Sequence, residues 1–421
     1  MTFSSKEFKI LHWFYPVLFF VCLLQAMGYI PPKGMPGEGV YIWPFRLILI
    51  YFGVKSFLKN NIKCAILTIY IIYSLFSFVL YAFNGYPIKL YIFDIAFYLS
   101  GIFFAYVGMD NSDYSDKFRE YTFYAIIVAF AIGMYLFFFN PPWYQDAWVI
   151  NYNGRWYKEG LNADFDFISA NMRFSSFFMS SYATEYYGLF AFPFALCGVI
   201  KEKNRKKRNL YMFCALFILL ALVLSMQRAA IISAILMLVF LGIYDMNHSR
   251  STFSFYIYLI AGIIVLVSVY ATTNLGERVL DRFGKLTLSD AFSESRISQN
   301  EDLLGVWNNL IVGNGLGTGG NEARKMGYPA VTDSNYVKIL VEQGVVGFLL
   351  FLSFIIMTCK RIVSNFKYLA VEGAFFASIL IAMVGSNSLM FSLFMPPFWY
   401  SVGRIWNDDY IKYLKIKNTH V

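Results

Sequence analysis

Charged residues are scarce in this chain. Lysine, arginine, aspartate and glutamate make up 14% of its 421 residues, whereas hydrophobic residues make up 58% and aromatic residues 20%. The mean hydropathy is +0.53. So little charge excludes an intrinsically disordered chain and argues against an ordinary soluble domain. The composition instead predicts a protein that crosses a membrane several times.

Histidine and cysteine are also rare, which restricts the chemistry available. The chain has three histidines, His12, His248 and His420, and five cysteines that all fall within or beside apolar segments. No group of histidine, cysteine or acidic residues has the spacing of a metal site. The sequence therefore predicts no disulfide framework, no metal and no cofactor.

Apolar segments fill most of the chain, and each is close to the ~20 residues that a helix needs to cross the hydrocarbon core. We expect an all-α polytopic membrane protein with about twelve transmembrane helices and residues 1–421 forming a single integral membrane domain. The predicted spans lie near 11–29, 40–58, 64–83, 91–109, 121–139, 184–200, 210–225, 229–244, 253–272, 337–358, 368–388 and 389–406.

Basic residues orient these spans, because short loops rich in lysine and arginine stay in the cytoplasm. Six of the eight residues in 201–208 are basic. With that loop inside, both termini are predicted to be cytoplasmic, and two long polar stretches, 140–183 and 273–336, share the outer side. The formal net charge of +9 is then a retention signal, and we expect no nucleic-acid partner.

Acidic residues match or outnumber basic ones in both outer loops, so anion binding must depend on individual arginines. Arg228 stands where two spans meet with almost no loop between them. Burying its charge in a membrane is costly unless it is paired or hydrated. It either reaches the interface as part of a turn, or faces an anionic group such as a phosphate, which a guanidinium can bind through two hydrogen bonds.

Other arginines of the outer loops are weaker candidates. Arg173 lies just before a predicted span. Arg296 precedes apolar positions with helical spacing, which predict an amphipathic helix that acts as a lid or takes part in catalysis. Arg324 is a candidate by its position alone.

Two further features lie in the second loop. The glycines of 313–320 lack the strand and helix context of a nucleotide-binding loop, so we interpret them as a tight turn beneath a bulky ligand. Asp333, at the mouth of a span, is either a helix cap or a carboxylate that orients or deprotonates a hydroxyl. Loop aromatic residues either stack on sugars or anchor the protein at the interface: Trp143, Trp148, Tyr152, Trp156 and Tyr157.

Taken together, four segments resemble the superfamily of O-antigen polymerases and O-antigen ligases, which are polytopic inner-membrane proteins with two large outer loops. The segments are Arg173–Phe177, Ser225–Arg228, Gly315–Gly317 and Asp333–Gly347. The ligases carry a His-Asn pair before a tyrosine, with Glu-x-Gly further on. Aligning Tyr336, Glu342 and Gly344 with that pattern puts Asp333 at the position of the ligase histidine. The loop has no histidine, so the chain resembles the Wzy-type polymerase branch.

The resemblance implies a GT-C-like fold whose outer, periplasmic loops are partly helical. It also implies a glycosyltransferase of lipopolysaccharide or other polysaccharide biosynthesis. Such an enzyme transfers a growing glycan from undecaprenyl diphosphate to the next lipid-linked repeat unit, without a metal. By motif match, Arg173 and Arg228 would bind the diphosphate and take part in catalysis, together with Asp333 near the acceptor. Arg296, by a less close match, and Arg324, by its position alone, would assist in substrate binding.

Partners and rival functions follow from the same comparison. The expected partners are the lipid-linked oligosaccharide, membrane lipid and a Wzz-like co-polymerase that regulates chain length. Two rival functions remain open, an O-antigen ligase and a lipid-linked oligosaccharide flippase. A structural or sensory membrane protein is a third alternative, since no sequence feature demonstrates turnover. The flippase reading would require charged residues inside the bundle, for which Arg46, Asp94, Glu185 and Glu372 are the main candidates.

Overall fold

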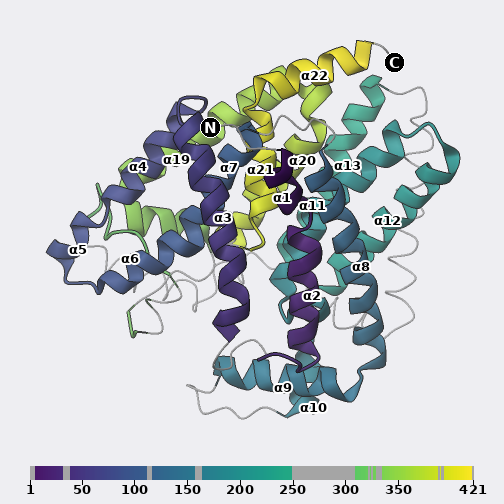
Figure 1. Cartoon of the computed structure of the whole chain (residues 1–421), viewed down its shortest axis with the longest axis horizontal. Helices are drawn as coiled ribbons and strands as arrows, with labels where there is room; N and C mark the ends of the chain where they lie inside the picture. Colours follow the sequence, from purple (N-terminus) through teal and green to yellow (C-terminus); the bar gives the residue numbers. More distant parts are fainter. Residues whose placement is uncertain are drawn as a thin grey trace, which may run out of the picture. The chain divides into compact units, whose positions relative to one another are not determined.

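The described part of the protein is helical (Figure 1). The computed structural model describes residues 5–31, 38–110, 116–156, 164–248, 309–320, 334–386 and 393–419, together with residues 323, 326–328 and 389. No strand occurs among them. Seven of the helices in these ranges are long and apolar enough to cross a membrane: Val40–Asn60, Ile88–Asp110, Lys117–Phe139, Ser181–Lys201, Arg205–Leu224, Asn335–Ser364 and Phe366–Gly385. The all-helical fold is therefore confirmed for the described residues, and the length and composition of these seven helices fit an α-helical membrane protein.

Three further apolar helices, Phe14–Ala26, Ala65–Tyr81 and Arg228–Gly242, coincide with predicted spans but are shorter. The predicted span 253–272 lies outside the described residues. The run 389–406 differs from a span, because its helix α21 covers only Pro396–Ile405 and is completely buried. Two prolines set the start of α21, and ten residues extend only about 15 Å. The total of twelve spans stays a prediction.

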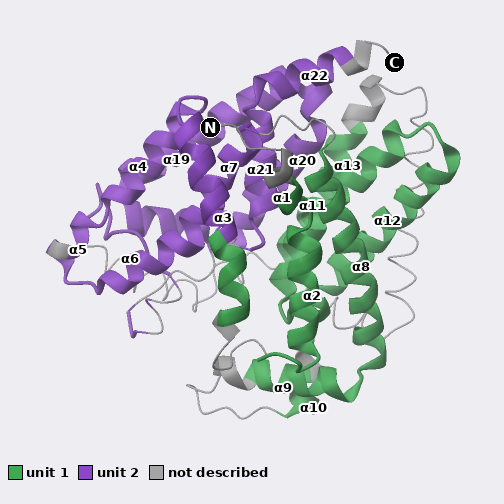
Figure 2. Ribbon diagram, in the orientation of Figure 1, with its two compact units in different colours: residues 1–47, 115–268 green, residues 48–114, 269–421 purple. Residues whose placement is uncertain are grey.

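Internal packing divides the chain into two compact units, each made of two separate stretches (Figure 2). Unit 1 comprises residues 1–47 and 115–268, and unit 2 comprises residues 48–114 and 269–421. Helix α3, Glu38–Asn60, belongs partly to each. The candidate residues Arg173 and Arg228 both belong to unit 1.

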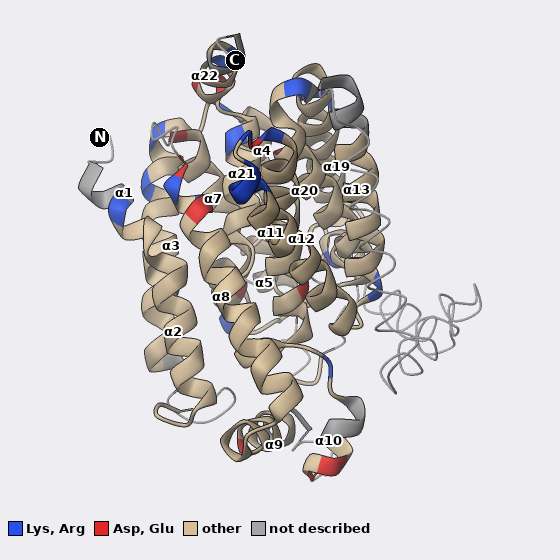
Figure 3. Ribbon diagram, turned by 90° about the vertical axis from the view of Figure 1, so that its right-hand side faces the viewer, with Lys and Arg blue, Asp and Glu red and all other residues tan. Residues whose placement is uncertain are grey.

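Helices of unit 1 vary in length and polarity. Helix α2 carries no charge along its length, and α10 begins with an acidic turn at Asp166 (Figure 3). Helix α12 begins at Arg205 and is capped by Asn204, whose side chain accepts hydrogen bonds from the backbone amides of Lys206 and Lys207. The described elements are α1 Ser5–His12, α2 Phe14–Ala26, α8 Lys117–Phe139, α9 Pro142–Trp156, α10 Phe165–Asn171, the 3₁₀ turn η3 Ser176–Phe178, α11 Ser181–Lys201, α12 Arg205–Leu224 and α13 Arg228–His248.

Glycines allow α11 to pack closely against α12 in unit 1. A Cβ atom on Gly188 would lie 2.5 Å from Leu222, and one on Gly198 would lie 2.4 Å from the ring of Tyr211. Small residues at helix contacts are the usual way for membrane helices to approach each other. This contact holds the end of α12 beside the beginning of α11, where the candidate site lies.

Unit 2 contains the remaining described helices. Its closest helix contact joins α7 and α21, where a Cβ atom on Gly403 would lie 1.9 Å from the carbonyl oxygen of Ala105. This contact buries the short helix α21. The elements are α4 Ala65–Phe76, α5 Val79–Asn84, α6 Ile88–Asp94, the π-helical turn η1 Ile95–Leu99, α7 Ser100–Asp110, α19 Asn335–Ser364, α20 Phe366–Gly385, α21 Pro396–Ile405 and α22 Asp408–Thr419.

The first long polar stretch, 140–183, contains α9, α10 and η3, which confirms that it is partly helical. Of the second stretch, 273–336, only residues 309–320, 323, 326–328 and 334–336 are described. The side of the membrane on which either stretch lies stays a prediction.

Candidate functional site

The segment from Met172 to Ser180 turns into the interior of unit 1. All its residues are buried except Arg173, which is partly exposed. The hydroxyl of Ser176 donates to the backbone oxygen of Ala129 on α8 at 2.7 Å, and the hydroxyl of Tyr144 on α9 donates to the backbone oxygen of Ser176 at 3.1 Å. Because two helices hold this segment, the backbone that follows Arg173 is fixed.

Phe174 joins this segment to the end of α12. Its amide donates to the carbonyl oxygen of Leu224 at 3.0 Å. Leu224 is the last residue of α12, so this bond satisfies a carbonyl that has no partner within the helix. The ring of Phe174 packs against Phe130 and Phe137 of α8, with centroids 5.9 and 5.8 Å away. Arg173 is thereby held next to the α12–α13 hairpin.

Three residues connect α12 to α13, and Arg228 is the first residue of α13. Met226 has a φ of 52°, which reverses the chain direction. The hydroxyl of Ser225 donates to the backbone oxygen of Leu222 at 2.6 Å, and the side-chain amide of Gln227 donates to the hydroxyl of Ser181 at 2.7 Å. These bonds tie the hairpin to itself and to the start of α11.

The two arginines are close enough for their charges to interact. The pKa of Arg173 is lowered, mainly because the side chain is buried. The positive charge of Arg228 lowers the pKa further, whereas Tyr182 and Tyr152 partly offset these effects. Arg173 forms no ion pair within the described part of the chain. Two like charges at a partly buried position attract an anion, since binding one relieves their repulsion and supplies hydrogen-bond acceptors. The structure thus brings together two residues that the sequence singled out separately.

The other three predicted site residues, Arg296, Arg324 and Asp333, lie outside the described residues. Their proximity to Arg173 and Arg228 stays a prediction. The apolar stretch after Arg296 is only partly described: Leu310 and Ile311 lie in a turn and are exposed.

The glycines of the second stretch contact protein in unit 2. Gly313, Gly315 and Gly317 have φ values of 79°, 108° and 93°, which favour glycine. A Cβ atom would lie 2.5 Å from the backbone of Gln343 at Gly313, and 2.8 Å from the ring of Tyr81 at Gly315. Close approach of the chain to its own helices therefore accounts for these glycines, in place of the bulky ligand that the sequence suggested.

This glycine-containing turn is bonded to a kink in α19. Gly344 has φ 64° and ψ −170°, which interrupts the helix. The amides freed by the kink, those of Val345 and Val346, donate to the backbone oxygens of Leu310 and Ile311 at 2.9 and 3.1 Å. The glycine of the Glu-x-Gly pattern thus produces a kink to which residues 309–317 bind through backbone hydrogen bonds.

Beside the kink lies a buried charged cluster of Lys338, Glu342 and Asp94. The ammonium group of Lys338 lies 2.9 Å from Asp94 Oδ2 and 2.6 Å from Glu342 Oε2. The other oxygen of Glu342 accepts a hydrogen bond from the amide of Gly319 at 2.9 Å. All three side chains are at most 5% exposed. The two carboxylates therefore compensate the charge of the buried lysine.

Sequence reasoning missed this cluster, although a signal for it was present. Lys338 and Glu342 are four residues apart, which puts them on one face of a helix. Both lie in an apolar span, where an unpaired charge is expensive. That pairing was predictable, whereas the contact with Asp94 required the tertiary structure, since more than two hundred residues separate it from Lys338.

Of the loop aromatic residues that the structure describes, Trp148 is buried, and Trp143 and Tyr152 are partly exposed. Trp148 is 7% exposed and packs edge-on against Tyr144 at 6.4 Å, so it is not available to stack on a sugar. Tyr152 packs on Phe167 and interacts electrostatically with Arg173. Tyr157 lies outside the described residues, as does the side chain of Trp156.

Within the described ranges, no three histidine, cysteine or acidic side chains are grouped closely enough to hold a metal ion. No protein-family model matches this sequence, and no curated protein is significantly similar to it.

Proposed function

We propose that this protein is a membrane glycosyltransferase that polymerises lipid-linked oligosaccharide repeat units. The donor would be a growing glycan on undecaprenyl diphosphate, and the acceptor a sugar hydroxyl on the next lipid-linked unit. The proposal includes twelve spans in a GT-C-like arrangement, a location in the cell inner membrane, cytoplasmic termini, and chemistry on the outer face.

The approach of Arg173 and Arg228 to each other is the observation that carries this proposal. Like charges are unfavourable together at a partly buried position. The five hydrogen bonds that fix the two segments nevertheless keep these arginines near each other, which favours a role in binding an anion. A diphosphate matches them, because each guanidinium can donate two parallel hydrogen bonds to phosphate oxygens.

The transfer requires the anomeric C–O bond to the diphosphate to break, and its electron pair stays on the phosphate oxygen. A new bond forms between the anomeric carbon and the acceptor oxygen, and the acceptor proton passes to a base. Arg173 and Arg228 would stabilise the charge that develops on the departing diphosphate. Asp333 is the proposed base or acceptor-orienting group, and Arg296 and Arg324 would extend the anion site.

A growing polymer needs control of its length. We therefore include a Wzz-like co-polymerase in the proposal as a partner that stops elongation. The lipid-linked oligosaccharide and the surrounding membrane lipid are the other partners.

Replacement of Arg228 tests the function directly. Arg228→Ala and Arg228→Lys would be expressed in a strain that lacks its polymerase, and the surface glycan separated on a gel. We expect Arg228→Ala to abolish the ladder of long chains, because the departing charge loses its stabilisation, and Arg228→Lys to restore it only in part, because lysine lacks the planar fork.

Arg205→Ala is the matched control, since Arg205 is exposed at the opposite end of α12. It should leave the ladder unchanged. A full ladder from Arg228→Ala at normal protein level would contradict the role of Arg228. A null mutant distinguishes a polymerase from a ligase. If the protein is a polymerase, single repeat units are still attached to the lipid core, whereas loss of a ligase leaves the core without any repeat units.

The buried charged cluster of unit 2 favours one other function, a lipid-linked oligosaccharide flippase. Transporters commonly hold ionisable groups among their helices, and Lys338, Asp94 and Glu342 are such groups. In a null mutant, repeat units accumulating on the cytoplasmic side would identify a flippase, whereas units accumulating on the outer side would identify a polymerase.

A further inference from the structure

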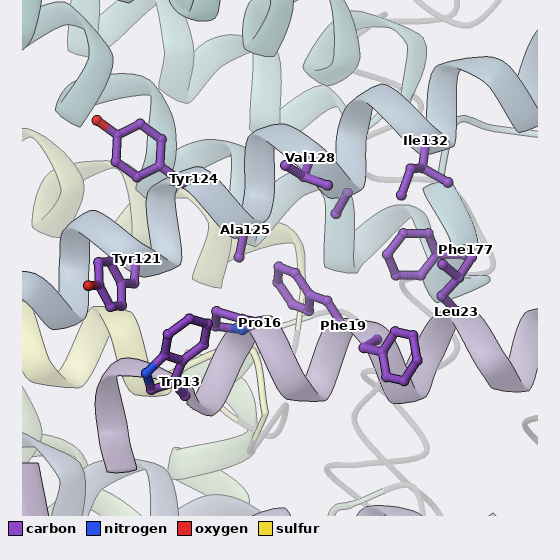
Figure 4. A pocket seen from close by; sticks show the side chains of 12 residues that line it. Trp13, Pro16, Phe19, Leu23, Tyr121, Tyr124, Ala125, Val128, Ile132 and Phe177 are labelled. Carbon is purple, nitrogen blue, oxygen red and sulfur yellow. The ribbon is translucent and has the colours of Figure 1, made fainter. Parts of the chain in front are cut away.

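A groove runs between α2 and α8 in unit 1 (Figure 4). Its volume is about 390 Å³, within the range of ligand sites. Side chains from both helices line it, among them Phe20 and Leu23 of α2 and Ala125, Val128 and Ile132 of α8. The small side chain of Ala125 leaves room that a larger residue would fill.

The groove is long, narrow and almost completely apolar. Along α8 it extends from Tyr121 to Ile132, and along α2 from Pro16 to Leu23, which is about 10–16 Å at the helical rise. The polar atoms among its lining side chains are the indole nitrogen of Trp13 and the hydroxyls of Tyr121 and Tyr124, all toward one end (Figure 4). A single hydrocarbon chain fits this shape and chemistry.

Phe177 forms the opposite end of the groove, near Leu23 and Ile132 (Figure 4). It belongs to η3, in the same buried segment as Arg173. Three residues lie between Arg173 and Phe177, so the Cα atoms of these two residues are at most about 14 Å apart. The next residue, Phe178, packs against α2, with its ring 4.9 Å from that of Phe19. The apolar groove and the arginine pair therefore meet at one short, rigid segment.

We propose that this groove holds the first part of the polyisoprenoid chain of the lipid donor, while its diphosphate lies against Arg173 and Arg228. The inference rests on the proposed function, whose donor has one apolar chain and an anionic head. One groove leading toward two cations matches that molecule. A phospholipid differs, since it has two tails and a single phosphate.

Substitution at Ala125 tests the tail site kinetically. Ala125→Trp would fill the groove, and Ala131→Trp is the matched control because Ala131 is exposed on α8 and does not line it. Initial rates would be measured with donors that carry either an eleven-unit or a two-unit isoprenoid chain. Ala125→Trp should lower kcat/KM for the long-chain donor at least tenfold and leave that for the short-chain donor unchanged. Ala131→Trp should change neither.

A binding measurement that needs no turnover separates this inference from the proposed function. Wild-type protein in vesicles of phosphatidylglycerol would be labelled with a polyisoprenyl diphosphate that carries a photoreactive group in its second isoprene unit. We expect crosslinks to α2 and α8 around Leu23 and Ile132, displaced by excess undecaprenyl diphosphate. If those crosslinks form but no polymer is made, the tail site stands and the polymerase function fails.

Two results would overturn the tail site. One is equal displacement of the label by phosphatidylglycerol or by a neutral polyprenol, which would indicate that ordinary bilayer lipid fills the groove. The other is equal loss of long-chain activity in Ala125→Trp and Ala131→Trp, which would indicate a general effect on α8. Thermal unfolding of both variants in detergent verifies that each is folded.

Discussion

A buried cluster in unit 2 surrounds Lys338 with carboxylates, whereas a site in unit 1 places Arg173 and Arg228 beside each other. Lys338 has Asp94 and Glu342 within 2.9 Å. Arg173 has Arg228 as a charged neighbour and no ion pair among the described residues. A compensated cluster lowers the cost of burying charge, and two like charges side by side raise it. The difference indicates that the cluster of unit 2 stabilises the fold, and that the pair in unit 1 favours a bound anion.

Removal of Lys338 should have the largest effect on stability. Lys338→Met leaves two buried carboxylates without a cation, which costs about 3–5 kcal/mol. We expect a large fall in the melting temperature of the purified protein in detergent. The triple variant Asp94→Asn, Lys338→Met, Glu342→Gln should recover most of it, because no charge remains buried. If Lys338→Met alone had the melting temperature of the wild type, the cluster would not contribute to the stability of the fold.

Removal of Arg173 should lower activity and leave stability largely unchanged. In Arg173→Ala the repulsion with Arg228 is gone, so the melting temperature should stay the same or rise. Activity with a lipid-linked donor should fall by about 10²–10³, as it does when one donor to a developing charge is lost. The assay is polymer formation by purified protein. If Arg173→Ala lowered the melting temperature as much as Lys338→Met, Arg173 would stabilise the fold and would not serve mainly to bind an anion.

Substitution of Gly344, at the kink of α19 beside the Lys338 cluster, should affect stability. Its φ of 64° and ψ of −170° lie in a region that glycine alone adopts readily, and strain there costs about 1–3 kcal/mol. In Gly344→Ala the new Cβ atom would also lie 2.3 Å from the backbone oxygen of Ile311. We expect reduced stability in chemical denaturation. Gly385→Ala is the control, because nothing lies within 4 Å of its Cβ position.

Loss of the hydroxyl of Ser181 should have the smallest effect. Ser181→Ala removes the acceptor of the Gln227 side-chain amide, a bond worth about 0.5–1.5 kcal/mol. Gln227 directly precedes Arg228, so loss of this bond should displace Arg228 and raise the KM for the donor, while the melting temperature changes little. A raised KM at nearly unchanged stability would distinguish a positioning role from a purely structural one. Ser181→Thr keeps the hydroxyl and should restore the KM. An unchanged KM in Ser181→Ala would separate the hairpin bond from donor binding.

Sequence patterns predicted the helices better than the contacts between them. Apolar length found the spans that are now described, because a membrane helix must satisfy its backbone within itself. It misjudged the run 389–406, since length and hydropathy do not distinguish a lipid-facing span from a buried helix such as α21. The glycines of 313–317 were recognised as a turn, yet their partners Tyr81 and Gln343 are distant in the chain.

The sequence by itself determined that this protein is helical and membrane-embedded, and it singled out Arg173 and Arg228 as charges near apolar segments. Those properties are local, since each depends on composition and spacing within about one helix length. Only the tertiary structure decided that these two arginines approach each other, that Lys338 meets Asp94, and that an apolar groove ends at Phe177. Contacts of this kind join residues far apart in the chain, and packing alone selects them.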